Sequence, residues 1–163
     1  RVYYSAYSPI PDASTALPQE RPPLLREHRL YQADWMLRFY GFALGEVAEA
    51  MEGGHLPLDI DPKRAWALAN RHLFPIDVNR ASRELLLRVP GLGPKVVARI
   101  LAARRHRTLR WEDLTRLAAS PRSVKPWVTA LDWRPTALVD RADLRALVTA
   151  PRQGDLFARQ AAA

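Results

Sequence analysis

The chain has 163 residues, 48% of them hydrophobic, which suits one ordinary domain or two small ones around a modest core. It contains no cysteine, which excludes disulfides, zinc–thiolate sites, cysteine nucleophiles and cysteine-ligated iron–sulfur clusters within these residues. Long apolar runs, an initial methionine and a signal-peptide pattern are all absent, so we expect a cytoplasmic part of a longer protein.

Positive charge is concentrated in the second half of the chain. The net charge is +8, but residues 1–78 carry 8 Lys and Arg against 10 Asp and Glu, whereas residues 79–163 carry 17 against 7. Apart from Lys95 and Lys125, these later cations are arginines, whose planar guanidinium suits phosphate oxygens. The asymmetry favours a polyanion as the partner of the second half. A merely solvated basic surface, with arginine codons favoured by a G+C-rich genome, explains the same composition.

Residues 1–21 combine a β-prone start with a proline-rich connection. Tyr3, Tyr4 and Tyr7 lie in a run that predicts a short N-terminal strand whose sheet partners are absent from the chain. The prolines that follow impose an extended path. The tyrosines are interpreted as packing residues of this strand, in preference to a base-stacking role.

Residues 22–75 predict a helical connecting region. A helix should run from Pro22 to Gly41, with a core-facing stripe at three- to four-residue intervals. The stripe consists of Leu24, Leu25, His28, Tyr31, Trp35 and Phe39. His28 is interpreted as a core residue, with the lining of a substrate pocket as the less favoured alternative.

Two shorter helices complete this region. One should cover Leu44–Met51 and end at Gly53-Gly54. The pair Asp61-Pro62 supplies an N-cap and a proline at the first helical position, predicting a helix over Pro62–Asn70 with Trp66 facing inward. Asp59 and Asp61 are interpreted as capping residues rather than metal ligands.

Residues 76–133 predict two helices joined by a glycine hairpin. Asn79 should cap a helix over Ser82–Arg88, and a second helix should cover Pro94–Arg105 with an apolar face of Val96, Val97, Ile100 and Leu101. Between them, the segment Val89-Pro90-Gly91-Leu92-Gly93 reverses the chain tightly. We expect Leu92 to point back between the helices and fix their angle. An ordinary tight turn is the alternative reading.

The hairpin also has the features of an anion site. Its two glycines let a ligand approach the backbone closely, and Pro94 opens the second helix where a missing N–H costs least. The amides of Gly91, Gly93 and Lys95 should therefore be free at a helix N-terminus, which attracts phosphate. The predicted DNA-binding residues are Pro90, Gly91, Leu92, Gly93, Pro94, Lys95, Arg99, Arg104, Arg105 and Arg107. Bulkier residues at both glycines, or Lys95→Glu, should weaken duplex binding with little loss of fold.

This arrangement resembles the helix-hairpin-helix family, and the run from Val78 to Lys95 follows the pattern of the tandem modules of competence DNA receptors and repair proteins. The resemblance implies a second hairpin about 30 residues later, near Leu117–Ser123, between helices over Trp111–Leu117 and Ser123–Ala130. That turn has no glycine. We expect a degenerate second hairpin that supports the first without gripping phosphate.

Across nearly its whole length the chain is similar to the C-terminal region of bacterial DNA modification or repair radical SAM proteins. The similarity is carried by the runs 2–9 and 23–35, by Asp61-Pro62-Lys63, by Trp66-Ala67 and by the hairpin segment. It implies that the first strand ends an upstream barrel whose three cysteines bind a [4Fe–4S] cluster and S-adenosylmethionine. Neither cofactor has ligands in this chain, so no catalytic or metal-binding residue is assigned, and the four scattered histidines predict none.

The C-terminal part predicts a short helix and a polar tail. Asp140 should cap a helix over Arg141–Val148, within residues 134–150. In the tail, residues 151–163, the run Gln153-Gly154-Asp155-Leu156-Phe157 resembles the peptide that binds the bacterial sliding clamp. The resemblance implies contacts by Gln153, Asp155, Leu156 and Phe157. A tail that docks on its own domain is the alternative.

Together these patterns predict a mainly α fold: a helical bundle with a tandem helix-hairpin-helix. The expected function is binding of duplex DNA by its backbone, without sequence readout, for a radical SAM modification or repair enzyme upstream, in the cytoplasm at the nucleoid. A sliding clamp is a second expected partner, a repair glycosylase partner is left unidentified, and no membrane is expected. An RNA-binding module and a helical protein-interaction domain are the alternative functions.

Overall fold

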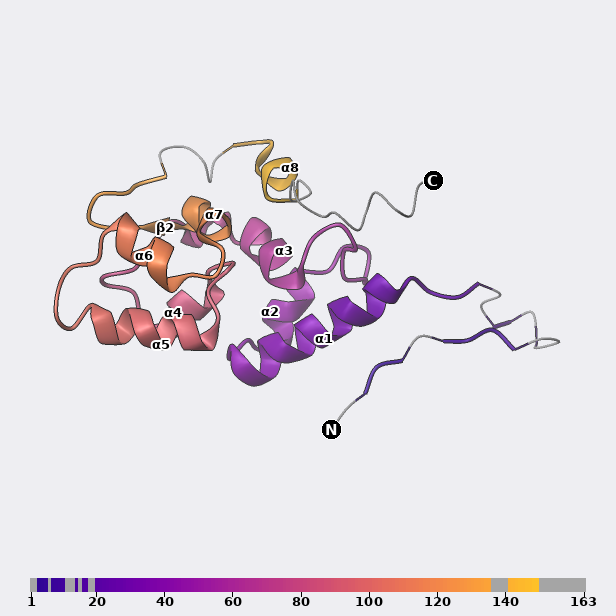
Figure 1. Cartoon of the computed structure of the whole chain (residues 1–163). Coiled ribbons are helices and arrows are strands. Elements are labelled where there is room, and N and C mark those ends of the chain that lie inside the picture. The colour runs from indigo at the N-terminus through magenta and orange to yellow at the C-terminus, as the bar shows by residue number, and fades with distance from the viewer. Residues whose placement is uncertain are drawn as a thin grey trace, which may run out of the picture.

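The computed structural model describes residues 3–5, 7–10, 14, 16–17, 20–135 and 141–149 (Figure 1). These residues are mainly helical, which confirms the predicted fold class. The elements in chain order are α1 (Leu24–Phe39), α2 (Leu44–Glu49), α3 (Pro62–Ala69), a 3₁₀ turn (Arg71–Leu73), β1 (Ile76–Asp77), α4 (Arg83–Arg88), α5 (Pro94–Ala103), α6 (Trp111–Leu117), α7 (Pro121–Val124), a 3₁₀ turn (Lys125–Trp127), β2 (Val128–Thr129) and α8 (Leu144–Thr149). No helix within these ranges has the length and apolar content needed to cross a bilayer.

The elements form two groups that share one core. Helices α4 to α7 and the strand pair gather at one end of the molecule, and α1 to α3 lie at the other (Figure 1). Helix α8 returns to α3, where the guanidinium of Arg64 donates to the carbonyl of Val148 at 3.1 Å. Arg145 of α8 also forms ion pairs with Glu52 and Asp59. Asp59 thus has an electrostatic role instead of the predicted capping role.

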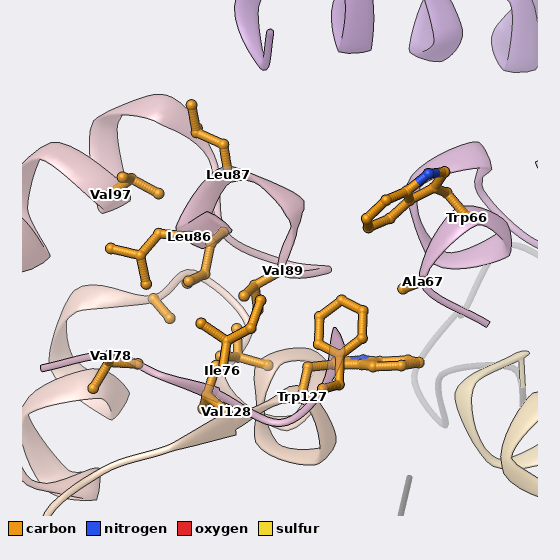
Figure 2. Close-up of a cluster of buried hydrophobic side chains, with 14 of the residues drawn as sticks. Trp66, Ala67, Ile76, Val78, Leu86, Leu87, Val89, Val97, Trp127 and Val128 are labelled. Atoms are coloured by element: carbon orange, nitrogen blue, oxygen red, sulfur yellow. The ribbon is translucent and has the colours of Figure 1, made fainter. Parts of the chain in front are cut away.

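Aromatic and branched side chains join the two groups (Figure 2). Phe74 makes edge contacts with Trp66 of α3 and with Trp127, with ring centroids 6.4 and 5.0 Å apart. Trp66 is buried, as the sequence predicts. Figure 2 shows Leu86, Val89 and Val97 packed in the same cluster, so the glycine hairpin stands on the central core. Each such side chain contributes about 1.5–3 kcal/mol on burial.

Helix α1 presents a different face to the core from the one predicted. Ala33 and Met36 are buried, whereas His28 is exposed and Trp35 and Phe39 are 53% and 55% exposed. Apolar residues surround this helix on several sides, so their spacing does not single out one face. The small Ala33 lets α1 approach its neighbours closely. The predictions that His28 and the stripe of Trp35 and Phe39 are core are therefore wrong.

The segment predicted as a helix over Ser123–Ala130 is broken into three elements. Helix α7 ends at Val124, a 3₁₀ turn follows, and β2 pairs in parallel with β1, with Ile76 opposite Val128 and Asp77 opposite Thr129. Pro126 has no amide to donate within a helix, and Val128 and Thr129 are β-branched. Parallel pairing with β1 buries Val128 completely.

Two predicted helix caps have different outcomes. Asp61 caps α3 as expected, because its carboxylate accepts from the amide of Arg64 at 3.0 Å. Asn79 does not cap α4. Ser82 does so instead, accepting from the amide of Leu85 at 3.3 Å. The side chain of Asn79 is committed to the backbone of Leu109, at the start of the second motif.

The described residues of the predicted N-terminal strand form no strand. The backbone of Tyr4 instead bonds the hydroxyl of Tyr31, which accepts from the Tyr4 amide at 3.1 Å and donates to its carbonyl at 3.2 Å. The two rings pack edge to face with centroids 5.1 Å apart. A strand needs a neighbour for its backbone groups, and a side chain of α1 supplies the partner here.

The last helix begins later than predicted, at Leu144 rather than Arg141. The guanidinium of Arg141 pairs with Asp143 just before the helix. The expected cap, Asp140, and the expected clamp-binding peptide, residues 153–157, lie outside the described residues.

Candidate nucleic-acid interface

Helix α4, the segment Val89–Gly93 and helix α5 form a helix-hairpin-helix element. The side chain of Leu92 is 1% exposed and lies in the core with Leu86 from α4 and Val97 from α5. This confirms that Leu92 is the plug between the helices. Pro90 is also buried, so its side chain supports the turn instead of facing a ligand.

The two glycines of the hairpin have different reasons to be glycine. Gly91 has φ +85°, and a β-carbon there would lie 3.0 Å from Cγ2 of Val124 and 3.2 Å from Cβ of Ser123. Gly93 has φ −97°, and a β-carbon there would meet only the hydroxyl of Tyr40, at 3.5 Å. The structure corrects the expectation that both replacements leave the fold intact. Only Gly93 has the conformation and the space for a larger residue.

Main-chain amides of the hairpin and of the first turn of α5 have no partner among the described residues. They include the amides of Gly91, Gly93 and Lys95. Pro94 occupies the first helical position, as predicted, and brings no further donor. Gly91 and Lys95 are exposed, so solvent or an anionic ligand can reach this helix terminus. Free amides and the positive end of the helix dipole favour a phosphate at this place.

The exposed face of α5 continues from this terminus. Lys95 and Arg99 lie one turn apart, and both are exposed without an ion pair in the described part of the chain. Between and beyond them, Ala98 and Ala102 are exposed too. Because alanine side chains are small, the helix surface between the two cations does not project into solvent. A nucleic-acid backbone can therefore approach the helix closely along this face.

The remaining predicted arginines divide into free and engaged ones. Arg105 is exposed and forms no ion pair with a described residue. Arg104 donates to the carbonyls of Val78 and Ala81 at 3.2 and 2.7 Å, so its guanidinium holds α5 against the start of the module. Arg107 pairs with Asp113. The protein itself thus occupies two of the arginines predicted to face DNA.

A buried lysine from α3 supports the hairpin from below. The Nζ of Lys63 donates to the carbonyl of Leu92 at 2.6 Å and lies 4.5 Å from the ring centroid of Tyr40. The pKa of Lys63 is lowered to about 7, chiefly by burial; the carboxylate of Asp61 acts in the opposite direction, and Arg88 adds to the lowering. An amine that titrates near neutral pH therefore lies directly beneath the turn.

The second motif braces the first hairpin. Its turn, residues 118–120, contains no glycine, and α7 follows at once. The hydroxyls of Ser120 and Ser123 are 2.9 Å apart, and Ser123 also accepts from Arg64 at 2.9 Å. Ser123 and Val124 are the residues that lie against Gly91. This contact is in keeping with a supporting second hairpin, while its contact with DNA stays a prediction.

Sequence reasoning missed three residues at this site: Trp35, Tyr40 and Lys63. Trp35 and Tyr40 come from α1 and its end, and both line a hollow beside Gly91–Gly93. The only sequence signal for Lys63 is a charged residue among Pro62, Ala65 and Trp66 on a helix predicted to be buried. Within the described ranges, no group of three or more His, Asp or Glu side chains gathers in a geometry that would hold a metal ion.

The chain is similar to the Holliday junction branch migration complex subunit RuvA of Micrococcus luteus, with 32% identity over 99 residues, 58% of this chain. It spans 45% of the length of that relative. No protein-family model matches the chain, and no solved structure matches it significantly. The similarity agrees with a helix-hairpin-helix DNA-binding domain as the class of module that α4 and α5 form.

Proposed function

We propose that this chain holds DNA by its phosphate backbone, at the glycine hairpin and along the exposed face of α5, without reading base sequence. The observation that carries the proposal is the set of three unpartnered amides at Gly91, Gly93 and Lys95, at the N-terminus of a helix. Unpartnered amides at a helix N-terminus favour binding of a phosphate. Lys95 and Arg99 supply charge for that phosphate and the next along the strand.

We expect no base readout because of the kinds of side chain that the hairpin and α5 expose. Base edges are read by long polar side chains that enter a groove, such as Asn, Gln or Arg in a bidentate position. The hairpin presents main-chain groups, Ala98 and Ala102 are the exposed residues between the cations of α5, and we assign Lys95 and Arg99 to phosphates. Contacts of this kind fix the position of a backbone and carry no sequence information.

The named relative adds a specific form of DNA to be tested. Its name refers to the Holliday junction, a four-way DNA structure. Because contacts to the backbone respond to the path of the strands, a branched DNA would present phosphates to this surface differently from a linear duplex. A four-way junction therefore belongs in the binding assay as a second DNA form.

The test is a fluorescence anisotropy titration of the 163-residue chain with labelled duplexes at several salt concentrations. Two duplexes of unrelated sequence should bind equally, and the logarithm of affinity should fall linearly with the logarithm of salt concentration. The double variant Lys95→Glu/Arg99→Glu should lower the slope by about 2, because each lost phosphate contact removes about 0.9. Arg26→Glu is the matched control, since this exposed arginine lies at the far end of α1.

Three outcomes oppose the proposal. A loss in Arg26→Glu half as large as that in the double variant would show that only total charge matters, because the control reverses one charge and the double variant reverses two. Tighter binding of an RNA duplex would favour an RNA-binding module. No binding to any nucleic acid at low salt would favour a helical protein-interaction domain, to which the exposed apolar residues of α1 would then belong.

We also propose that the bound DNA is presented to a radical SAM modification or repair domain that precedes these residues in the same protein. Large exposed apolar side chains in the first part of the chain support a covering domain: Tyr3, Ile10, Leu24 and Leu44 are each more than 60% exposed. The cluster and S-adenosylmethionine would be bound there, because this chain has no cysteine. Reading the residues that precede Arg1 tests this: a sequence without a three-cysteine cluster removes the proposal.

The proposed link to a sliding clamp depends on the sequence of the tail alone. Gln153, Asp155, Leu156 and Phe157 have the order of a clamp-binding peptide. The immobilised chain should retain purified bacterial clamp. This retention should be lost when Leu156 and Phe157 are replaced by alanine. Equal retention by the double alanine variant, or none by the parent chain, would rule the peptide out.

A further inference from the structure

A hollow of about 300 Å³ lies beside the glycine hairpin, between the end of α1 and the start of α3. Its walls include Trp35, Tyr40, Asp61, Lys63 and the backbone of Gly91–Gly93. The amides of Gly91 and Gly93, which are proposed to hold a phosphate, therefore lie at the rim of this hollow. A base attached to that phosphate through its sugar can reach the hollow.

The walls combine one broad aromatic surface with groups that donate and accept hydrogen bonds. Trp35 is 53% exposed, although it lines the hollow, which leaves its ring available for contact. Tyr40 keeps its proton at neutral pH, because burial raises its pKa and the carboxylate of Asp61 raises it further. Its hydroxyl donates to no described residue. A tryptophan face and such a donor suit a flat heterocycle better than an aliphatic chain.

Two further side chains define what the hollow accepts. Gln32 also lines it, and its carbonyl oxygen is used by Arg29 at 2.9 Å, which leaves the amide hydrogens of Gln32 as donors. Asp61 accepts from the amide of Arg64 and pairs with its guanidinium, and its carboxylate keeps acceptor capacity. With Tyr40 and Gln32 as donors and Asp61 as an acceptor, the walls suit a group that has both acceptors and donors.

We propose that the hollow takes one unpaired nucleobase of the DNA strand held at the hairpin, stacked on Trp35 and bonded by Tyr40 and Asp61. This inference rests on the proposed DNA binding and adds a preference for DNA with an unpaired base. Base stacking on an aromatic side chain tolerates any base, so the site would select for an unpaired base without selecting its identity.

The experiment compares two short duplexes of the same sequence, one fully paired and one with a single 2-aminopurine as a one-nucleotide bulge. The chain should bind the bulged duplex more tightly by about fivefold or more, the effect of one stacked base. The fluorescence of 2-aminopurine should be quenched on binding, because its base stacks on Trp35. Simple exposure of that base to water would raise the fluorescence instead.

Three variants make the result specific. Trp35→Ala should bring the affinity for the bulged duplex down to that for the paired duplex and abolish the quenching. Tyr40→Phe, which keeps the ring over Lys63, should lower the preference by removing one donor. Phe39→Ala is the matched control, since Phe39 is as exposed as Trp35 on the same helix and does not line the hollow. Circular dichroism checks that each variant is folded.

The outcomes separate this inference from the DNA binding it rests on. If the chain binds neither duplex, the DNA-binding proposal fails. If it binds both equally, or if Trp35→Ala behaves like Phe39→Ala, duplex binding stands and the nucleobase site is overturned. Preference for a bulged RNA over a bulged DNA would overturn the assignment to a DNA strand.

Discussion

The side chain of Asn79 bonds both backbone groups of Leu109: its Nδ2 donates to the carbonyl at 3.1 Å, and its Oδ1 accepts from the amide at 2.8 Å. Asn79 leads into the first helical motif and Leu109 into the second. The side chain of Asn79 thus links the start of the first motif to the start of the second. The second motif in turn packs against the hairpin.

Removal of this link should destabilise the chain. Asn79→Ala leaves the part-buried amide of Leu109 without a partner, while the carbonyl keeps its bond from the amide of Leu131 at 3.0 Å, so the free energy of unfolding should fall by about 1–3 kcal/mol. Urea unfolding followed by tryptophan fluorescence measures the change. Asn70→Ala is the control, because its amide bonds a more exposed glutamate, Glu49. Equal losses in the two variants would contradict a special role for Asn79.

Alanine replacements at the two hairpin glycines should affect the free energy of unfolding differently. Gly91→Ala should lower the free energy of unfolding by about 1–3 kcal/mol, because φ is positive and the new methyl group meets Val124. Gly93→Ala should change stability by less than about 0.5 kcal/mol, since its backbone is extended and the nearest atom is 3.5 Å away.

The same pair then tests the phosphate contact. A methyl group at position 93 should hold the backbone of DNA away from the amides and weaken duplex binding about tenfold, the loss expected for one charged hydrogen bond. Anisotropy titration of Gly93→Ala gives this value. Unchanged affinity in a folded Gly93→Ala variant would mean that DNA does not approach the hairpin.

Two neighbouring arginines at the end of α5 should show opposite phenotypes. Arg104→Ala removes the donor to the carbonyls of Val78 and Ala81, so stability should fall by about 1–3 kcal/mol. Arg105→Ala should leave stability unchanged and lower the salt dependence of duplex binding by about 0.9. Paired unfolding and binding measurements on both variants decide the matter. A stability loss in Arg105→Ala, or a binding loss alone in Arg104→Ala, would contradict this division.

Lys63 should make stability depend on pH. Its pKa is about 7 in the folded chain and 10.5 when unperturbed. Below pH 7 the amine is charged in both states, and the folded state carries the full cost of burying that charge. Between pH 7 and 10.5 the unfolded chain binds more protons, so stability should rise by up to about 1.4 kcal/mol per pH unit.

The test compares the parent chain with Lys63→Met by urea unfolding between pH 6 and about pH 9.5. The parent should gain stability relative to Lys63→Met as the pH rises, because the variant lacks the titrating amine. Lys95→Met, at an exposed position, should keep the slope of the parent. Parallel curves for the parent and Lys63→Met would show that the buried amine does not titrate in this range.

The features that the sequence predicted well depend on neighbours in the chain. The Asp61 cap, the proline at the start of α5, the plug at Leu92 and the extent of α6 are each set by residues within a turn or two. Their geometry follows from backbone sterics and local hydrogen bonds. Such rules hold before any tertiary contact is known.

The features that it missed depend on contacts between distant segments. Lys63 and Leu92 are 29 residues apart, and no local pattern couples them. Apolar side chains lie on several sides of α1, and only packing selects the face with Ala33 and Met36. The sequence of β2 predicts a helix, because the strand that it pairs with, β1, precedes it by about 50 residues. Tertiary pairing overrides propensity in such short segments.

The parallel pairing of β1 with β2 also has a mechanical consequence. The chain enters the unit that contains the hairpin at the N-terminal end of one strand and leaves at the C-terminal end of the other, and the two strands run in the same direction. Tension between the flanking segments therefore pulls the strands along their length in opposite senses. Their hydrogen bonds are loaded together in shear, so the unit would resist being pulled open while it is attached to DNA.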